Sequence, residues 1–413
     1  MPPLDAIPLA ALVVLLVTAY VHPSARAELA VGLVAAAATL ATGILDLADV
    51  EAELRQLGPV VLFLVTILVV ADICGRAGLF AAAAARIREA SSGHPVRLFT
   101  GVFLLAAAVT AVLSLDATVV LLTPVVVAAA TTAGTSTWPG SHACLRMANS
   151  ASLLFPVSNL TNLLALPHLD LTFVGFAVAM APVLLAVLVV EYVVLRLLFR
   201  RQLAAPTEPR EHDPDPPLAP VPLVVVALML VGFAVGSPLG VEPCWISAAA
   251  AVVLVGWARH RGLVTLREAG AAAHPAFAVF VLCLGIVVAA LSTGFLGDLV
   301  ARLVPGGTSY VDLLAIALLA TVLANLLTNL SAALLLVPLV ASLGNTAVLA
   351  ALLGLNIGSG LTYTGSLANL LWRRTLVRLD TPPSLRQLHR VSLIATPLSL
   401  LAAVTMLSAV ADK

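Results

Sequence analysis

Apolar runs of helix length follow one another along almost the whole chain, and this feature constrains the fold most. They begin at about 5–21, 27–45 and 58–75 and continue to about 391–409. The 413 residues are 61% hydrophobic and 10% charged, with a mean hydropathy of +1.10. A soluble domain of this length cannot bury that much apolar surface. The sequence therefore predicts an all-α polytopic membrane protein whose partner is the lipid bilayer.

The charge, the cysteines and the N-terminus narrow the class further. A formal net charge of zero gives no sign of a nucleic-acid partner. The four cysteines are scattered without metal-ligand spacing, so we expect no metal and no cofactor. No basic residue precedes Asp5, so residues 5–21 are expected to be a retained span and not a cleaved signal peptide. We expect a multi-pass protein of the bacterial inner membrane.

A charged, proline-rich break divides the apolar runs into two sets. The segment "RRQLAAPTEPREHDPDPPLA" (200–219) reads as a solvent-exposed linker. The chain is therefore expected to consist of one half at 1–199, a cytoplasmic linker at 200–219 and a second half at 220–413.

Each half contains a pair of short apolar runs that predicts a re-entrant hairpin. The pairs span about 98–135 and about 311–342, and most of these runs are too short for about 30 Å of hydrocarbon at about 1.5 Å per residue. If the chain has two hairpins and about ten full spans, 18 of its 21 Lys and Arg residues lie on the cytoplasmic side, as the positive-inside rule requires. The exceptions are Arg55, Arg302 and Lys413. Each half then has an odd number of spans, which makes the halves inverted repeats.

Polar residues interrupt one run in each half, at about 145–168 and about 344–371. When "NSASLLFPVSNLTNLL" (149–164) is shifted by 207 positions, it lies over "NIGSGLTYTGSLANLL" (356–371). Asn149, Ser152 and Asn162 then coincide with identical residues. We predict a broken helix in each half, because non-helical backbone at membrane depth occurs where it lines a cavity or is buried in protein. The alternative is that these side chains only join neighbouring helices.

The hairpin tips repeat more loosely, as "SLDATVVLLTP" (114–124) and "TNLSAALLLVP" (328–338). Two tips and two broken helices related by inverted symmetry are the parts of a substrate site near the middle of the membrane. The candidate substrate- or ion-binding residues are Ser114, Asp116, Thr118, Asn149, Ser152, Ser158, Asn159, Thr161, Asn162, Thr328, Asn329, Ser331, Asn356, Ser359, Thr362, Thr364, Ser366 and Asn369.

Asp116 is the carboxylate that falls at a predicted tip, and a lone acid at membrane depth is a candidate functional residue. Burial disfavours its charged form, so we hypothesise that it carries a coupling proton. The alternative is a capping Asp that accepts from the following helix. No Arg or Lys falls in the tips or breaks, which favours a neutral cargo or a cation. Glu191 and Arg196 flank the end of a span and are expected at the interface.

The segments "SLDATVVLLTPVVV", "ANSASLLFPVSNLTNLL" and "LNIGSGLTYTGSLANLLW" resemble the signatures of ArsB-type arsenite efflux pumps, within the ion transporter superfamily. The resemblance implies a secondary transporter, not an enzyme. It would export arsenite in exchange for protons by an elevator-type movement, usually as a homodimer. Some such pumps recruit a separate ATPase, which stays open as a partner. Sodium/proton exchange and sodium-coupled di- or tricarboxylate transport are the alternative activities in the same superfamily.

Overall fold

The computed structural model describes residues 5–21, 24–205 and 219–411, and these residues form helices joined by turns and loops, without a strand. The helices of the first half are α1 (Ala6–Val21), α2 (Ala25–Leu40), α3 (Leu47–Arg76), α4 (Leu79–Ser91), α5 (Pro95–Val112), a π-helical turn (Ala117–Leu122), α6 (Thr123–Thr132), α7 (Thr137–Ser150), α8 (Leu160–Ala165), α9 (Phe173–Leu198) and α10 (Arg200–Leu203). Most of the predicted linker, residues 206–218, lies outside the described residues.

The second half repeats the pattern of long helices, a hairpin and a broken helix. Its helices are α11 (Pro220–Gly236), α12 (Pro243–His260), α13 (Leu266–Ala272), α14 (Pro275–Ser292), α15 (Phe295–Leu303), α16 (Tyr310–Leu327), α17 (Asn329–Ala341), α18 (Asn345–Asn356), α19 (Leu367–Arg378) and α20 (Leu385–Ala411). Seven segments of the described chain are long and apolar enough to cross a membrane, and several shorter apolar helices accompany them. The all-α polytopic prediction is confirmed.

Both predicted hairpins are present as reversals of the chain. In the first, α5 ends at Val112 and the chain returns through the π-helical turn into α6. In the second, α16 ends at Leu327 and α17 starts two residues later, at Asn329, and packs along α16. α5 and α16 are each long enough by composition to span the membrane, but the tips that follow them both line one cavity inside the molecule, as re-entrant hairpins require.

The two broken helices also form, but both extend beyond the predicted segments. α7 begins at Thr137 and not near 145, because the Ser136 side chain accepts a hydrogen bond from Trp138 N and caps the helix there. α7 ends at Ser150 and α8 resumes at Leu160, after two short 3-10 turns. α18 ends at Asn356, and α19 resumes at Leu367 and runs on to Arg378.

The same kind of cap restarts the helix after each break. Asn159 accepts from Thr161 N at 3.2 Å, and Ser366 accepts from Asn369 N at 3.3 Å. Asn159 and Ser366 are 207 positions apart (366 − 159), which is the offset that relates the two repeats in the sequence. Both helices therefore restart at equivalent points.

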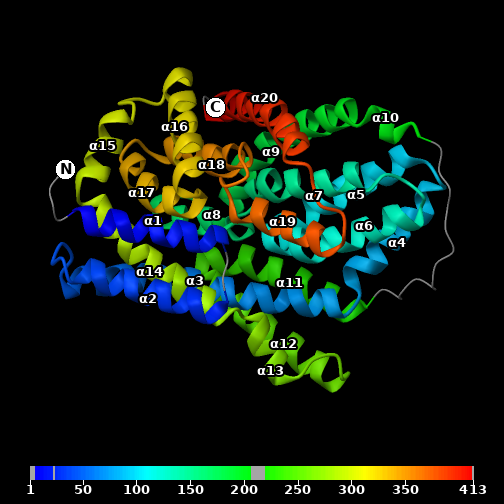
Figure 1. The fold of residues 1–413 in the computed structure, drawn as a ribbon, viewed down its shortest axis with the longest axis horizontal. Coiled ribbons are helices and arrows are strands. Elements are labelled where there is room, and N and C mark those ends of the chain that lie inside the picture. Colours follow the sequence, from blue (N-terminus) through cyan, green and yellow to red (C-terminus); the bar gives the residue numbers. More distant parts are fainter. Residues whose placement is uncertain (1–4, 22–23, 206–218, 412–413) are drawn as a thin grey trace.

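Figure 1 shows how these elements share the molecule. α1, α2 and α3 lie together on one side, and α14 packs against α1, α2 and α3. α9 and α20 pack along each other on the opposite side. α4, α6 and α10 gather at one end of the molecule, and the N-terminus and α15 lie at the other (Figure 1). The positive-inside rule assigns the end with α4 and α10 to the cytoplasm.

Candidate functional site

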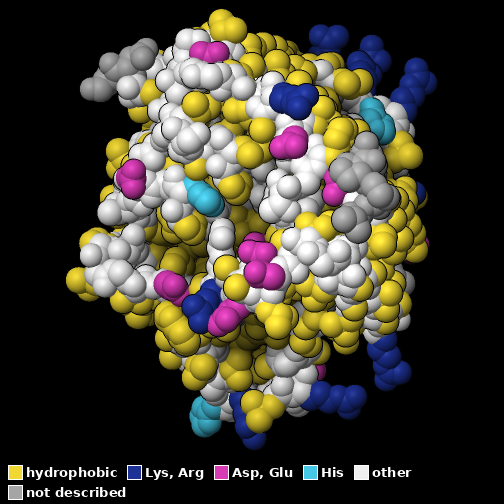
Figure 2. Space-filling model, turned by 90° about the vertical axis from the view of Figure 1, so that its left-hand side faces the viewer, with side chains coloured by type: hydrophobic (Ala, Val, Ile, Leu, Met, Phe, Trp, Pro, Cys, Tyr) yellow, Lys and Arg dark blue, Asp and Glu magenta, His cyan; other side chains and the backbone are white. Residues whose placement is uncertain are grey.

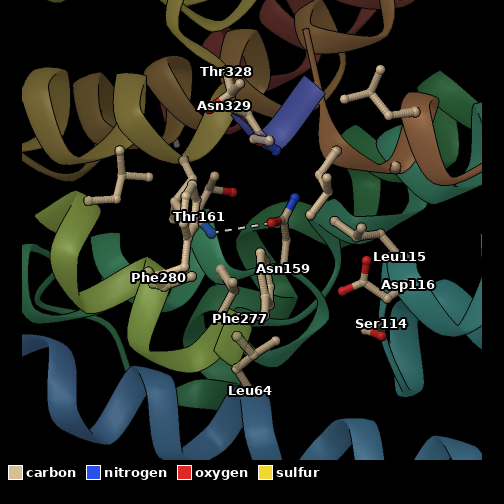
Figure 3. Close-up of a pocket in the computed structure, with 18 of the residues that line it drawn as sticks. Leu64, Ser114, Leu115, Asp116, Asn159, Thr161, Phe277, Phe280, Thr328 and Asn329 are labelled. Atoms are coloured by element: carbon tan, nitrogen blue, oxygen red, sulfur yellow. Dashed lines mark hydrogen bonds between the residues drawn. The ribbon is translucent and has the colours of Figure 1, made fainter. Parts of the chain in front are cut away.

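A cavity of about 320 Å³ lies where the two hairpin tips and the two breaks meet. The first tip contributes Ser114 and Asp116, and the second contributes Thr328 and Asn329. Figure 3 shows the two tips on different sides of this space, with the Asp116 carboxylate pointing into it. The hairpins enter from opposite ends of the molecule, so their tips can converge only near its middle.

Polar groups from the breaks complete one side of the cavity, and apolar side chains form the other. Ser158, Asn159, Thr161 and Thr364 line it from the breaks, and the Asn159–Thr161 hydrogen bond is visible in Figure 3. The facing wall comes from α1, α3 and α14; its aromatic and large aliphatic side chains include Phe63, Leu64, Ile67, Phe277 and Phe280. The cavity therefore offers hydroxyl and amide groups to a small polar cargo on one side only.

Asp116 is the charged side chain among the residues that line the cavity. It is half-buried, and no described residue forms a hydrogen bond or ion pair with its carboxylate. The capping role considered for it is wrong, because Ser114 Oγ and not Asp116 accepts from Ala117 N, at 3.2 Å. An uncompensated carboxylate in an otherwise neutral cavity favours a proton or a cation as its partner.

Thr328, at the second tip, has an unusual backbone conformation. Its φ is 70° and its ψ is 156°, a region that β-branched residues rarely occupy. The following Asn329 N donates to Gly365 O across the second break at 3.2 Å, which holds the tip against the break. Strain of this kind persists where the surrounding structure fixes it, and it is common at ligand-binding sites.

Four asparagines that the sequence placed in the site instead hold the two broken helices together. Asn149 Nδ2 donates to Asn369 Oδ1 at 2.9 Å, and Asn356 Nδ2 donates to Asn162 Oδ1 at 2.8 Å. The 207-residue offset converts one bond into the other. All four side chains are buried, and none lines the cavity.

Two of these asparagines, Asn162 and Asn369, also donate hydrogen bonds to backbone carbonyls of the breaks. Asn162 Nδ2 donates to Ser152 O and Phe155 O at 2.7 and 3.1 Å. The repeat-equivalent Asn369 Nδ2 donates to Ser359 O and Thr362 O at 3.0 and 2.7 Å. Since an unsatisfied carbonyl at this depth costs several kcal/mol, these bonds make the breaks possible.

The remaining candidates lie behind the cavity wall. Thr118 is buried and bonds Thr110 Oγ1 at 2.7 Å, and Ser331 lies 3.4 Å from Thr328 Oγ1. Ser366 Oγ donates to Asn149 Oδ1 at 2.9 Å. The candidates that do not line the cavity are Thr118, Asn149, Ser152, Asn162, Ser331, Asn356, Ser359, Thr362, Ser366 and Asn369.

Asn325 lines the cavity but was not among the predicted residues. Its Oδ1 accepts from Thr362 N at 3.0 Å and from Thr362 Oγ1 at 2.6 Å, while Nδ2 donates to Gly358 O at 2.9 Å. It thus fastens the end of α16 to the second break. A sequence signal exists: Asn325 is an amide in an apolar run, one turn before the hairpin tip.

Arg146 and Glu191 form a buried ion pair, although the sequence predicts Arg146 on the cytoplasmic side and Glu191 at the interface. Arg146 Nη2 lies 2.5 Å from Glu191 Oε1, and the two side chains are 1% and 0% exposed. Arg146 Nη1 also donates to Gly360 O in the second break and to Thr396 Oγ1 on α20. The pair is electrically neutral and does not line the cavity, so it adds no positive charge there.

Among the described residues, no group of three or more His, Cys, Asp or Glu side chains is arranged to hold a metal ion. Convergent hairpin tips, two broken helices and a cavity between them, inside a bundle of membrane-spanning helices, define a multi-pass membrane transporter. It lies in the bacterial inner membrane.

Comparison with known proteins gives the family. The chain belongs to the citrate transporter family (CitMHS), whose model matches residues 11–358. It is 28% identical over 358 residues to an arsenical pump membrane protein of Escherichia coli, covering 82% of this chain and 83% of that protein. The protein of the same name in Yersinia enterocolitica is 28% identical over 381 residues, covering 88% and 89%.

A solved structure has the same fold. The Alcanivorax borkumensis YdaH transporter, described as having an unusual topology, superimposes with a TM-score of 0.61 over 89% of each chain. The sequence identity is 17%, so this similarity concerns the fold alone.

Proposed function

We propose that this protein exports arsenite from the cytoplasm in exchange for protons. The observation that carries the proposal is the charge of the cavity: Asp116 supplies a carboxylate and no Arg or Lys lines the space. A di- or tricarboxylate would meet a like charge with no side-chain cation to balance it. Arsenite is an uncharged trihydroxide at neutral pH and needs only hydrogen bonds. The resemblance of the chain to arsenical pump membrane proteins supports the same cargo.

The polar side of the cavity supplies the hydrogen bonds that such a cargo needs. Asn329 and Thr364 carry amide and hydroxyl groups that donate as well as accept. Asn159 Nδ2 and Thr161 Oγ1 already donate to Asn356 Oδ1, each at 2.7 Å, so these two residues offer their oxygens as acceptors. None of the four cysteines lines the cavity. Reversible hydrogen bonds allow rapid release, whereas thiolates would retain trivalent arsenic. The site is therefore suited to turnover and not to storage.

Proton coupling rests on Asp116. Because no described side chain neutralises this carboxylate, its charge depends on what else occupies the cavity. In the proposed cycle, Asp116 takes up a proton when the site faces outside and releases it when the site faces the cytoplasm. After the proton has been released, the Asp116 carboxylate is ionised again and the next cycle can begin.

We propose an elevator-type movement for the change of access. The cavity wall includes the last turns of α1 and the first half of α14, which both lie toward the cytoplasmic end, so the present state faces inward. α4, α5 and α6 extend beyond α1 and α2 toward that end (Figure 1). In the proposal, the hairpins and broken helices of the halves 1–199 and 220–413 move against α1, α2, α3 and α14.

Sodium/proton exchange is a second candidate, because one carboxylate with nearby amide and hydroxyl oxygens also suits Na⁺.

The test uses purified protein in proteoliposomes with an imposed proton gradient and no ATP. We expect accumulation of arsenite that a protonophore abolishes and that neither sodium nor citrate changes. Sodium-driven uptake or inhibition by citrate would transfer the proposal to the other cargo. A requirement for ATP would indicate a separate ATPase subunit, and cross-linking in the membrane tests the proposed homodimer.

A further inference from the structure

A second cavity, of about 170 Å³, opens toward the end opposite the cytoplasmic one. Glu53 and Gln56 reach it from the first turns of α3, Ser292 from the end of α14, and His168 from the turn after α8. Figure 2 shows this end of the molecule, with a hollow rimmed by acidic and histidine side chains and a hydrophobic floor. The function proposed above makes no use of this space.

The two cavities share their walls. α17 contributes Leu330 to the inner cavity and Ala333 to the outer one, and α8 contributes Thr161 and Leu164 respectively. On α3, Leu64 lines the inner cavity and Gln56 the outer one. Gln56 and Leu64 are eight residues apart, which corresponds to about 12 Å along a helix. The cavities are therefore successive positions along one interface between α3 and α14 on one side and α8 and α17 on the other.

The two helices of the shared wall, α3 and α14, are in close contact beside the outer cavity. A Cβ atom on Gly285 of α14 would lie 2.1 Å from Leu57 Cδ1 and 3.1 Å from Glu53 Oε1. Leu57 is 1% exposed. α3 and α14 thus approach each other closely beside Glu53, on the wall that the two cavities share.

Glu53 and His168 are the titratable side chains that line the outer cavity, and neither forms a hydrogen bond with a described residue. Partial burial lowers the pKa of His168 and so favours its neutral imidazole. On α3, the neighbouring Glu51 pairs with Arg55 at 2.5 Å, and both are exposed. Asp170 follows His168 and is exposed. Neither α14 nor α17 carries a charged residue.

We propose that the outer cavity receives the transport site in its outward position, and that Glu53 is a fixed carboxylate that promotes proton uptake by the site there. This inference rests on the elevator-type movement proposed above. If the hairpins and broken helices moved by about 12 Å along α3, the groups that now lie opposite Leu64 would lie opposite Gln56 and Glu53. Asp116, which shares the inner cavity with Leu64, would then approach a like charge.

The chemistry follows from the sign of that interaction. A nearby carboxylate disfavours the ionised form of Asp116, so Asp116 binds a proton from outside at a higher pH than it would alone. When the site returns inward, Asp116 leaves Glu53 and the proton is released to the cytoplasm. Neutral His168 can accept protons at the same opening. Glu53 is a positioning residue for the proton and need not touch the cargo.

Transport measurements on the Glu53→Gln variant test this role. The matched control is Glu51→Gln, because Glu51 lies on the same helix but does not line the cavity. We expect Glu53→Gln to slow proton-driven export about tenfold at an outer pH of about 7. We also expect the dependence on outer pH to shift by about one unit toward acid, the size typical of one neighbouring charge. Glu51→Gln should behave as wild type. Equal profiles for both variants would overturn the role of Glu53.

Cross-linking tests the outward position without relying on the cargo. Leu160 on α8 packs against the cluster around Leu64, so Leu64→Cys with Leu160→Cys should be joined by Hg²⁺ in the present state. Gln56→Cys with Leu160→Cys should be joined only when the site has moved outward. The four native cysteines are buried and would be replaced first. Absence of the second cross-link, with the first present, would overturn the movement even if arsenite export is confirmed.

Discussion

Arg146 on α7 and Glu191 on α9 form a salt bridge of 2.5 Å between two completely buried side chains. Ser150 and Ser399 each donate to Glu191 Oε1, at 3.1 and 3.0 Å. The guanidinium also binds the Gly360 carbonyl in the second break at 3.3 Å. One ion pair thus connects the first broken helix, the second break and the final helix of each half.

Removing one partner of this pair should be severely destabilising. Arg146→Met leaves Glu191 buried and uncompensated, and we expect a loss of about 3–5 kcal/mol in the free energy of unfolding. Arg146→Met with Glu191→Leu should recover part of that loss. Arg55→Gln, which breaks an exposed pair with Glu51, serves as the control and should cost less than about 1 kcal/mol. Thermal unfolding in detergent measures all three, and equal losses for Arg146→Met and Arg55→Gln would contradict the assignment.

Substitutions of two asparagines that share a hydrogen bond should have non-additive effects on stability. Asn149→Ala and Asn369→Ala each leave buried polar groups unpaired, and we expect about 1–3 kcal/mol of destabilisation from each. The double variant should lose less than the sum, because both changes remove the same bond. The symmetry-related pair, Asn356 and Asn162, should respond similarly. A double-mutant cycle on unfolding midpoints measures the coupling, and strict additivity would refute it.

The sequence predicted the architecture because the repeats leave a trace in it. The 207-residue offset placed Asn149 over Asn356 and Asn162 over Asn369, and each break lies between two of these residues. It could not predict the partners. Equivalent residues do not bond each other; Asn149 bonds Asn369, the equivalent of Asn162. That crossed pairing follows from how the halves intertwine, which the spacing along the chain does not contain.

The buried ion pair was missed for a different reason. Arg146 stands at the start of the predicted run at about 145–168, so the span count places its charge on the cytoplasmic side. In the fold, Ser136 starts α7 early and the helix carries Arg146 inward, where Glu191 compensates its charge. Tertiary pairing of this kind leaves no periodic pattern in a sequence.

Close packing of α16 against α18 gives a third prediction. A Cβ atom on Gly354 would lie 2.1 Å from the backbone oxygen of Ala317. Because backbone cannot rotate away, Gly354→Ala should push the two helices apart and cost about 1–3 kcal/mol. Gly270→Ala is the matched control: it lies in the exposed part of α13, with nothing within 4 Å of a new Cβ, and should be neutral or stabilising by up to about 1 kcal/mol. Equal unfolding midpoints for the two variants would show that the helices can separate freely.

Asp116→Asn should separate coupling from folding. No described residue bonds the Asp116 carboxylate, so the amide should leave the unfolding midpoint unchanged. The variant cannot exchange a proton, and we expect proton-driven arsenite export to fall to background while arsenite still binds. Asp170→Asn, in an exposed loop, should transport as wild type. Transport in proteoliposomes at several outer pH values, with binding measured on the same samples, tells these functions apart. Full pH-driven export by Asp116→Asn would assign the coupling proton to another group and leave Asp116 without a role in transport.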